Sequence, residues 1–206
     1  MNIISDQKLS ILRLISLEGM IEDQRLVSLL ASRELFHIED AVRSNLNELK
    51  REGMVELVAS EYWSITEPGK LNLTESLHKK RKDLLSALKD NIWTSFKEQD
   101  SDLKKVCTMW QVMPDGSLNT HEDHEYDFDV IERLLSIHDR LCNLFGDDHR
   151  IEREFNGLLN DLSNALEEID EGQLEFFVGT SVNSYHNLWR ELHEDLLCTL
   201  GIDREE

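Results

Sequence analysis

The residues best suited to chemistry are histidines and carboxylates that lie close together in the second half of the chain. The segment 119–127 (NTHEDHEYD) holds His121 and His124 among four acidic residues. Histidine and carboxylate at short spacing are ligands of zinc, manganese and iron. No HExxH motif accompanies them, and solvated loops of this composition are common in acidic proteins. We therefore expect neither a metal nor a cofactor in this chain.

A second group of such residues follows helical spacing near the end of the chain. In the segment 184–197 (SYHNLWRELHEDLL), His186, Trp189 and His193 fall at i, i+3 and i+7, so they share one helix face with Tyr185 adjacent. Aromatic side chains with a few polar groups line small-molecule sites. Buried aromatic residues hydrogen-bonded to histidines would give the same pattern.

We predict that seven of these side chains converge on one cleft, because buried Tyr and Trp usually need a polar partner and histidine can provide one. An open cleft would bind a small-molecule ligand, whereas a closed one would be a polar core. The predicted ligand-binding residues are Trp110, His121, His124, Tyr185, His186, Trp189 and His193.

Helices are expected to position these residues. Apolar residues at helical spacing predict helices over 128–145, 150–169 and 184–200, and residues 103–112 look helical up to a turn at 114–116. Residues 173–178 (QLEFFV) are expected to form a short extended piece. The segment 101–206 therefore reads as an all-α module.

The first part of the chain shows a different pattern. Apolar spacing predicts three helices. The first covers about residues 7–18 and is capped by Asp6, the second begins at Asp23, and the third covers about residues 38–51. After Gly53 the period changes from 3.6 to 2, which predicts two strands, 54–58 and 62–66, joined by a tight turn. Three helices followed directly by a hairpin form the winged variant of the helix-turn-helix.

The predicted fold is therefore mainly α-helical, in three segments. Residues 1–70 form a winged helix of three helices and a β-hairpin, residues 71–100 a long connecting or dimerisation helix (helical over about 71–97), and residues 101–206 the helical module. A polar joint is expected at 97–102 (KEQDSD).

Charge and composition exclude several classes of protein. The 206 residues carry a net charge of −20, so the molecule as a whole does not bind nucleic acid or anionic membranes nonspecifically. Residues 1–100 carry 14 Lys and Arg against 17 Asp and Glu, whereas residues 101–206 carry 8 against 25. No apolar run approaches the roughly 20 residues of a membrane span. With no evident signal peptide and three widely spaced cysteines, we expect a cytoplasmic protein with reduced thiols.

The segment 46–70 (LNELKREGMVELVASEYWSITEPGK) resembles the third helix and wing of MarR-type and related winged-helix regulators, and the resemblance covers about residues 5–90. It implies a homodimer that binds double-stranded operator DNA. In such a dimer the recognition helices meet successive major grooves about 34–36 Å apart. The helices that flank the winged domain would form the dimer interface.

Side chains on the outward face of the third helix would read the DNA. Arginine and asparagine suit base edges, while serine and lysine suit phosphates. The basic run 78–82 (HKKRK) is expected on an exposed face of the long helix, either merely solvated or reaching flanking phosphates. The predicted DNA-binding residues are Arg33, Arg43, Ser44, Asn47, Lys50 and Arg51.

Acidic residues favour an alternative. Glu39 and Asp40 occupy the first turn of the third helix, and the predicted wing tip, Ser60 and Glu61, has no Lys or Arg. The alternative function is a winged-helix adaptor that binds protein and not DNA.

The second half is also similar to an accessory segment of some bacterial proteins related to phosphoenolpyruvate-utilising dikinases. The similar residues are WQV and PDG near 110–116, the histidine segment, and NSYHNLWRELHEDLL. The similarity implies a ligand-sensing or accessory module, because no glycine-rich phosphate loop or phosphohistidine motif is present. No serine or cysteine has a recognisable activating context, so we predict no enzyme. The predicted function is a DNA-binding transcriptional regulator with a C-terminal helical domain that senses a ligand or dimerises.

Overall fold

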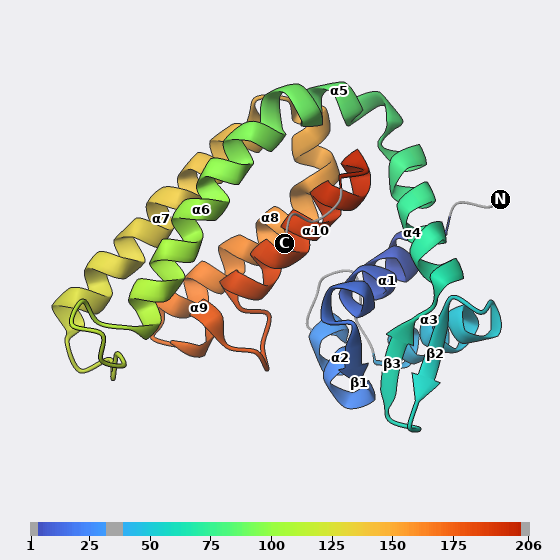
Figure 1. Cartoon of the computed structure of the whole chain (residues 1–206), viewed down its shortest axis with the longest axis horizontal. Coiled ribbons are helices and arrows are strands. Elements are labelled where there is room, and N and C mark those ends of the chain that lie inside the picture. Colours follow the sequence, from blue (N-terminus) through green and yellow to red (C-terminus); the bar gives the residue numbers. More distant parts are fainter. Residues whose placement is uncertain (1–3, 32–38, 203–206) are drawn as a thin grey trace. The chain divides into compact units, whose positions relative to one another are not determined.

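The computed structural model describes residues 4–31 and 39–202, and it is mainly helical with one small antiparallel sheet (Figure 1). The chain forms two compact units. Unit 1 comprises the described residues up to Leu85, together with Thr180–Asn183 and those from Asn187 onward. Unit 2 comprises Ser86–Gly179 and Ser184–His186. These units are divided differently from the predicted segments 1–70, 71–100 and 101–206.

Unit 1 alternates helices with short strands, and its sheet has the strand order β1-β3-β2. The three helices predicted before the hairpin and both strands of the hairpin are confirmed to within two residues at each described boundary. In chain order its first elements are α1 (Asp6–Glu18), β1 (Met20–Glu22), α2 (Asp23–Ala31), α3 (Glu39–Arg51), β2 (Val55–Val58), β3 (Tyr62–Ile65) and α4 (Glu67–Lys80).

Two local details of this unit differ from the sequence analysis. Ser5, not Asp6, caps α1, because the Ser5 hydroxyl accepts a hydrogen bond from the backbone N–H of Lys8 at 3.3 Å. Strand β1 is not predicted by the sequence, since three residues are too few for an alternating pattern to be read. It pairs with β3 along Met20–Ser64 and Glu22–Tyr62. The backbone therefore turns at Gly19 directly from a helix into the sheet.

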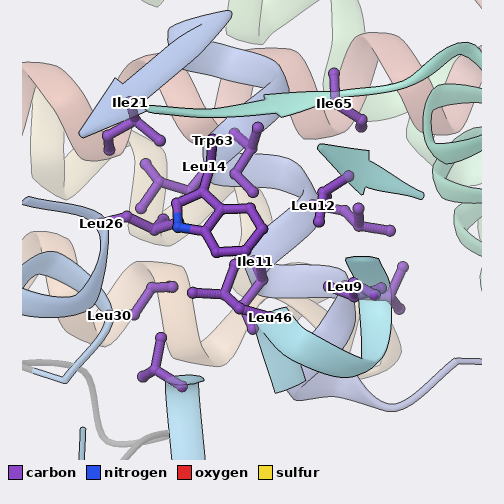
Figure 2. Packing of buried hydrophobic residues seen from close by; sticks show 14 of the residues in the cluster. Leu9, Ile11, Leu12, Leu14, Ile21, Leu26, Leu30, Leu46, Trp63 and Ile65 are labelled. Atoms are coloured by element: carbon purple, nitrogen blue, oxygen red, sulfur yellow. The ribbon is translucent and has the colours of Figure 1, made fainter. Parts of the chain in front are cut away.

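The core of unit 1 lies between the helices and the sheet. Trp63 of β3 sits in the middle of the apolar cluster, where Figure 2 shows side chains of α1 and α2 around its indole ring. Only 5% of Trp63 is exposed. Leu73 and Leu77 bring α4 into the same core. The β3 strand is thereby held against the helices, and its position in turn determines where α2 begins.

Gly69 in the first turn of α4 packs where no side chain fits. A Cβ at this position would overlap the backbone carbonyl oxygen of Met54 and lie 2.9 Å from Cγ1 of Ile65. We expect Gly69→Ala to lower the free energy of unfolding by about 1–3 kcal/mol, as overpacking does. Gly157→Ala in the helix α8 (His149–Asp170) should raise it by about 0.5–1 kcal/mol, because its Cβ meets open space in a helix interior. Urea unfolding of both variants measures the two signs, and equal effects would contradict the steric argument.

The single helix predicted over 71–97 is wrong. Helix α4 ends at Lys80, and Arg81, which caps it, turns inward and is 1% exposed. Three short turns follow before the next long helix, and they include a π-helical one. These elements are η1 (Lys82–Leu84), α5 (Leu85–Ala87), η2 (Leu88–Trp93) and α6 (Thr94–Gln111). The polar joint predicted at 97–102 is also wrong, because these residues lie within α6, where Gln99 and Asp100 are buried.

Unit 2 consists of helices that pack side by side. Helix α6 packs against α7 (His124–Gly146), and α7 packs against α8 (His149–Asp170), as Figure 1 shows. The helices predicted over 128–145 and 150–169 are confirmed as α7 and α8, and the one predicted over 184–200 is confirmed as α10 (Tyr185–Leu200), which belongs to unit 1 from Asn187 onward. The predicted extended piece at 173–178 is wrong, because residues Glu175–Val178 form the short helix α9, which buries Phe177. No helix within the described ranges is both long and apolar enough to cross a membrane.

Candidate functional site

The outward face of α3 presents the residues predicted to contact DNA. Its inward face, formed by Val42, Leu46 and Leu49, is buried in the core of unit 1. The predicted residues lie at i, i+1, i+4, i+7 and i+8, which places them on one side of a helix. They are exposed in the structure: Arg43, Ser44, Asn47, Lys50 and Arg51. The predicted contact Arg33 lies outside the described residues.

Arg43 is held in place by an acidic residue of α2. Its Nη1 donates to Oδ2 of Asp23 at 2.7 Å, and Oδ1 of the same carboxylate accepts from Nε1 of Trp63 at 2.8 Å. Burial by itself would raise the pKa of Asp23, but the hydrogen bonds from Trp63 and Arg43 outweigh it and hold this pKa below its ordinary value. Asp23 is therefore charged at neutral pH and paired with Arg43.

The other cations of this face are less constrained. The ammonium of Lys50 lies 5.9 Å from the centre of the Trp63 ring, within cation–π range. Lys50 and Arg51 form the last turn of α3, where the helix dipole favours cations. At the other end, Glu39 and Asp40 complement the dipole of the first turn. The face thus changes from acidic to basic along the helix.

The turn between β2 and β3, which was predicted to be a wing tip, has no basic side chain. Ala59 and Ser60 adopt positive φ values of 49° and 67°, which gives a tight turn between β2 and β3. Glu61 follows, and it is exposed. A contact between this turn and a DNA minor groove would therefore have to use backbone or hydroxyl groups.

The expectation that the basic run 78–82 lies along one exposed face is wrong at Arg81. Its Nη1 donates to Oγ1 of Thr199 at 2.7 Å, and its Nη2 to Oδ2 of Asp195 at 2.8 Å. Nε of Arg13 lies 3.1 Å from the other oxygen of Asp195. Arg81 thus fastens the end of α4 to α10 inside unit 1. Sequence reasoning missed it because a basic residue among lysines gives no sign of a buried partner more than a hundred residues away.

The hollow beside this buried pair is too small for a ligand. It is bordered by Arg13, Leu73, Glu191 and Asp195, and its volume is about 10 Å³. This is roughly the space that one water molecule needs. The Arg81–Asp195 pair is therefore a structural element of unit 1 and no binding pocket.

In unit 2, the rings of Trp110 and His121, two of the seven predicted ligand-binding residues, lie in contact. The Trp110 ring lies 4.2 Å from the Phe177 ring and 4.4 Å from that of His121, between centroids. Nδ1 of His121 lies 3.0 Å from Oδ2 of Asp127, whose Oδ1 accepts from the amide of Asn119 at 2.7 Å. These contacts fasten the loop before α7 to the end of α6. We find no group of three His, Cys, Asp or Glu arranged to hold a metal among the residues that the structure describes.

Tyr185 belongs to a second, buried polar cluster of unit 2. Its hydroxyl lies 3.3 Å from Nδ1 of His138, and Nε2 of His138 lies 3.2 Å from Oγ of Ser163 and 3.4 Å from Sγ of Cys142. The Ser163 hydroxyl donates to the carbonyl of Leu159, so its oxygen is free to accept from Nε2 of His138. Burial lowers the pKa of His138 and favours its neutral form.

The remaining predicted ligand residues lie elsewhere in the chain. His124 is exposed at the first position of α7, Trp189 is buried, and His186 and His193 are half-buried on α10. Trp110 and His121 belong to unit 2, whereas Trp189 and His193 belong to unit 1. A single cleft shared by all seven residues therefore stays a prediction.

The cysteines are not activated as nucleophiles. Cys107, Cys142 and Cys198 are free thiols, each half-buried. Burial raises the pKa of Cys107 to about 12 and that of Cys198 to about 11. A thiol with such a pKa carries almost no thiolate at neutral pH, so neither suits covalent catalysis.

An open hollow of about 450 Å³ lies beside the π-helical turn η2, and no pattern in the sequence predicted it. It is lined by Asn91, Ile92 and the turn between α7 and α8. Within this turn, Asp148 caps α8 and accepts from Nε and Nη2 of Arg150 at 3.0 and 2.6 Å. Asp147 and His149 also line the hollow, and both are exposed. We assign no ligand to it.

Comparison with family models, curated proteins and solved structures finds no match to this chain. The function must therefore be argued from the arrangement of side chains on α3 and around it.

Proposed function

We propose that unit 1 is a winged helix that binds double-stranded DNA through α3, and that the chain is a transcriptional regulator and not an enzyme. One observation carries the proposal. Helix α3 has a fully buried inner face and exposes Arg43, Ser44, Asn47, Lys50 and Arg51 on its outer face. In the order of the chain it follows α2 and precedes the β-hairpin of β2 and β3. This element order matches that of winged helix-turn-helix domains.

The negative charge of the chain confines the proposed DNA interface to a small part of its surface. A net charge of −20 repels phosphates from most of the surface. The cations of α3 can neutralise phosphates only over a short stretch of duplex, so sequence readout must contribute much of the affinity. In this arrangement Arg43 and Asn47 face base edges, while Ser44, Lys50 and Arg51 face phosphates.

Fluorescence anisotropy with two labelled duplexes tests the proposal. One duplex carries the region upstream of the protein's own gene, and the other has the same length and composition in random order. We expect tighter binding to the first at both low and moderate salt, because base contacts do not depend on counterion release. Equal affinity for the two duplexes would contradict specific DNA binding.

Substitutions on α3 should separate the two kinds of contact. Arg43→Ala should reduce the preference for the specific duplex by about 1–3 kcal/mol, the worth of one bidentate base contact. Lys50→Ala should weaken binding to both duplexes alike and reduce the salt slope by about 1. Lys70→Ala is the matched control, because Lys70 is exposed on α4 and paired with Glu67 at 2.7 Å. A loss of preference in the control would contradict the assignment to α3.

We further propose that the protein acts as a homodimer and that unit 2 senses a small-molecule ligand or contributes to dimerisation. A pair of winged helices reads two half-sites, whose centres lie about 34–36 Å apart. Since α4 ends at Lys80, the dimer cannot rest on one continuous helix over 71–97. Light scattering of the protein, free and with a two-half-site duplex, measures its stoichiometry. One chain per duplex would contradict the dimer.

A protein-binding adaptor is the second candidate, and the outer face of the sheet favours it. Met20, Val58 and Tyr62 are 56%, 37% and 41% exposed. The register places them on one face, next to the exposed Glu22 and Glu56. An apolar patch among acids suits protein better than DNA. Equal affinity for the two duplexes would favour this candidate.

A further inference from the structure

The carboxylate of Asp23 joins three elements of unit 1. Oδ1 accepts from Nε1 of the buried Trp63 at 2.8 Å, and Oδ2 accepts from Nη1 of Arg43 at 2.7 Å. The backbone N–H of Asp23 donates to the carbonyl of Glu61 at 2.8 Å. Asp23 is therefore fixed at its backbone by the wing and at its side chain by a core residue, before it meets Arg43.

The contact with Asp23 leaves most of the N–H donors of the Arg43 guanidinium available for a base. Arginine has five N–H donors in a rigid plane, and one of them is used by Asp23. Arg43 itself is 44% exposed at its side chain. A guanine presents two acceptors, O6 and N7, in the major groove, and a guanidinium can donate to both at once. Such a bidentate contact requires a fixed orientation of the plane, which a freely rotating arginine on a helix surface lacks.

We propose that Asp23 is a positioning residue that holds Arg43 in the orientation needed to read one guanine. The inference rests on the proposed function, because it concerns the same α3 face. It adds to that function a base identity and a residue outside the recognition helix. Asp23 touches no base itself, since its two oxygens are engaged by Trp63 and Arg43.

Removal of the negative charge of Asp23 should have two opposite effects on DNA binding. A carboxylate near DNA repels phosphates, so its loss strengthens binding to any duplex. The same loss frees Arg43 to rotate, so the energy that distinguishes guanine from other bases falls. A purely structural role would change both affinities in the same direction.

The experiment uses Asp23→Asn in the full chain. The amide oxygen of asparagine can still accept from Trp63, while its NH₂ group cannot accept from Arg43. The probes are the upstream duplex that the wild type prefers and three versions of it, each with another base in place of one guanine. That guanine is the one whose replacement weakens binding of the wild type the most and binding of Arg43→Ala the least. We expect Asp23→Asn to reduce discrimination at that position by about 5- to 30-fold and to bind random duplex more tightly than wild type does.

Two further variants make the result specific. Glu22→Gln removes the same charge from the neighbouring exposed residue, so it should leave base discrimination unchanged. In the Arg43→Ala background, Asp23→Asn should cause no further loss of discrimination, because the two residues act through one contact. The thermal midpoint of Asp23→Asn is measured beside them, and it should remain within a few degrees of the wild type.

Different failures have different meanings. Unchanged or increased discrimination in Asp23→Asn would overturn the inference while leaving DNA binding intact, and an increase would show that Asp23 withholds Arg43 from the base. An additive loss in the double variant would overturn it as well. Wild-type protein that prefers no duplex would refute the proposed function, and the inference with it.

Discussion

Asp195→Ala should lower the free energy of unfolding by about 3–5 kcal/mol, the cost of removing one partner from a buried ion pair. Asp195 is wholly buried and Arg81 is 1% exposed, with Nη2 of Arg81 2.8 Å from Oδ2 of Asp195. Arg13 contributes a second cation at 3.1 Å. Without the carboxylate, the guanidinium of Arg81 stays inside unit 1 and loses the charged acceptor that Asp195 provides. Urea unfolding followed by circular dichroism measures the change.

Two variants serve as controls for Asp195→Ala. Glu67→Ala breaks the exposed pair with Lys70, and we expect less than about 1 kcal/mol. Asp195→Leu combined with Arg81→Met removes both charges, so it should recover much of the stability that Asp195→Ala loses. A loss of less than about 1 kcal/mol in Asp195→Ala would show that the pair is not buried in solution.

The pH dependence of stability gives a separate test of this carboxylate. Burial alone would raise the pKa of Asp195, but the charges of Arg13 and Arg81 and the hydrogen bond from Arg81 lower it below its ordinary value. A carboxyl group with a lowered pKa in the folded state stabilises the fold above its unfolded pKa, about 3.9, and this contribution is lost as the pH falls below it. The wild type should therefore lose stability below about pH 4 more steeply than the Asp195→Leu, Arg81→Met variant.

Trp110→Ala should destabilise unit 2 by about 3–5 kcal/mol, as large-to-small substitutions of buried aromatic residues do. Trp110 is 2% exposed, and its ring stacks on Phe177 at 4.2 Å with an interplanar angle of 8°. The substitution leaves a cavity and also removes the surface on which His121 rests at 4.4 Å. Denaturant unfolding measures the loss, and hydrogen exchange should locate it in α6, α9 and the loop before α7.

Trp93→Ala is the matched control for Trp110→Ala, because Trp93 belongs to the same unit but is only partly buried at the end of η2. We expect it to cost clearly less. Trp110→Phe should recover part of the stability, since a smaller ring still contacts Phe177. If the two alanine variants were equally unstable, the stack of Trp110, Phe177 and His121 would not be the main support of this end of the unit.

Local pattern was sufficient to predict most elements of this chain. The helices α1, α2, α3, α7, α8 and α10 and the strands β2 and β3 follow from apolar spacing and from glycines such as Gly19 and Gly53. Short pieces were not predictable in this way. Strand β1 pairs with the edge of β3, and Phe177 of α9 stacks on Trp110. Neither contact is visible within three or four residues of sequence.

The outward face of α3 was also predictable, because the buried face of a helix determines which residues remain outside. The pairing on that face was not predictable, because Asp23 lies on another element. One oxygen of its carboxylate accepts from Arg43 while the other accepts from Trp63 of a third element. The buried Arg81 shows the same limit. Its run HKKRK is typical of a solvated surface, and Asp195 and Thr199 lie more than a hundred residues further along the chain.

The sequence by itself therefore determined the kind and order of most of the longer regular elements and the exposed face of α3, since these depend on residues within one or two turns of each other. Only the tertiary structure decided which polar groups meet. It joined Asp23 to Arg43 and Trp63, Arg81 to Asp195, and His121 to Asp127 and Trp110. The physical reason is that the burial of a charge or an aromatic ring depends on long-range packing, and a side chain's own neighbours in sequence do not reveal it.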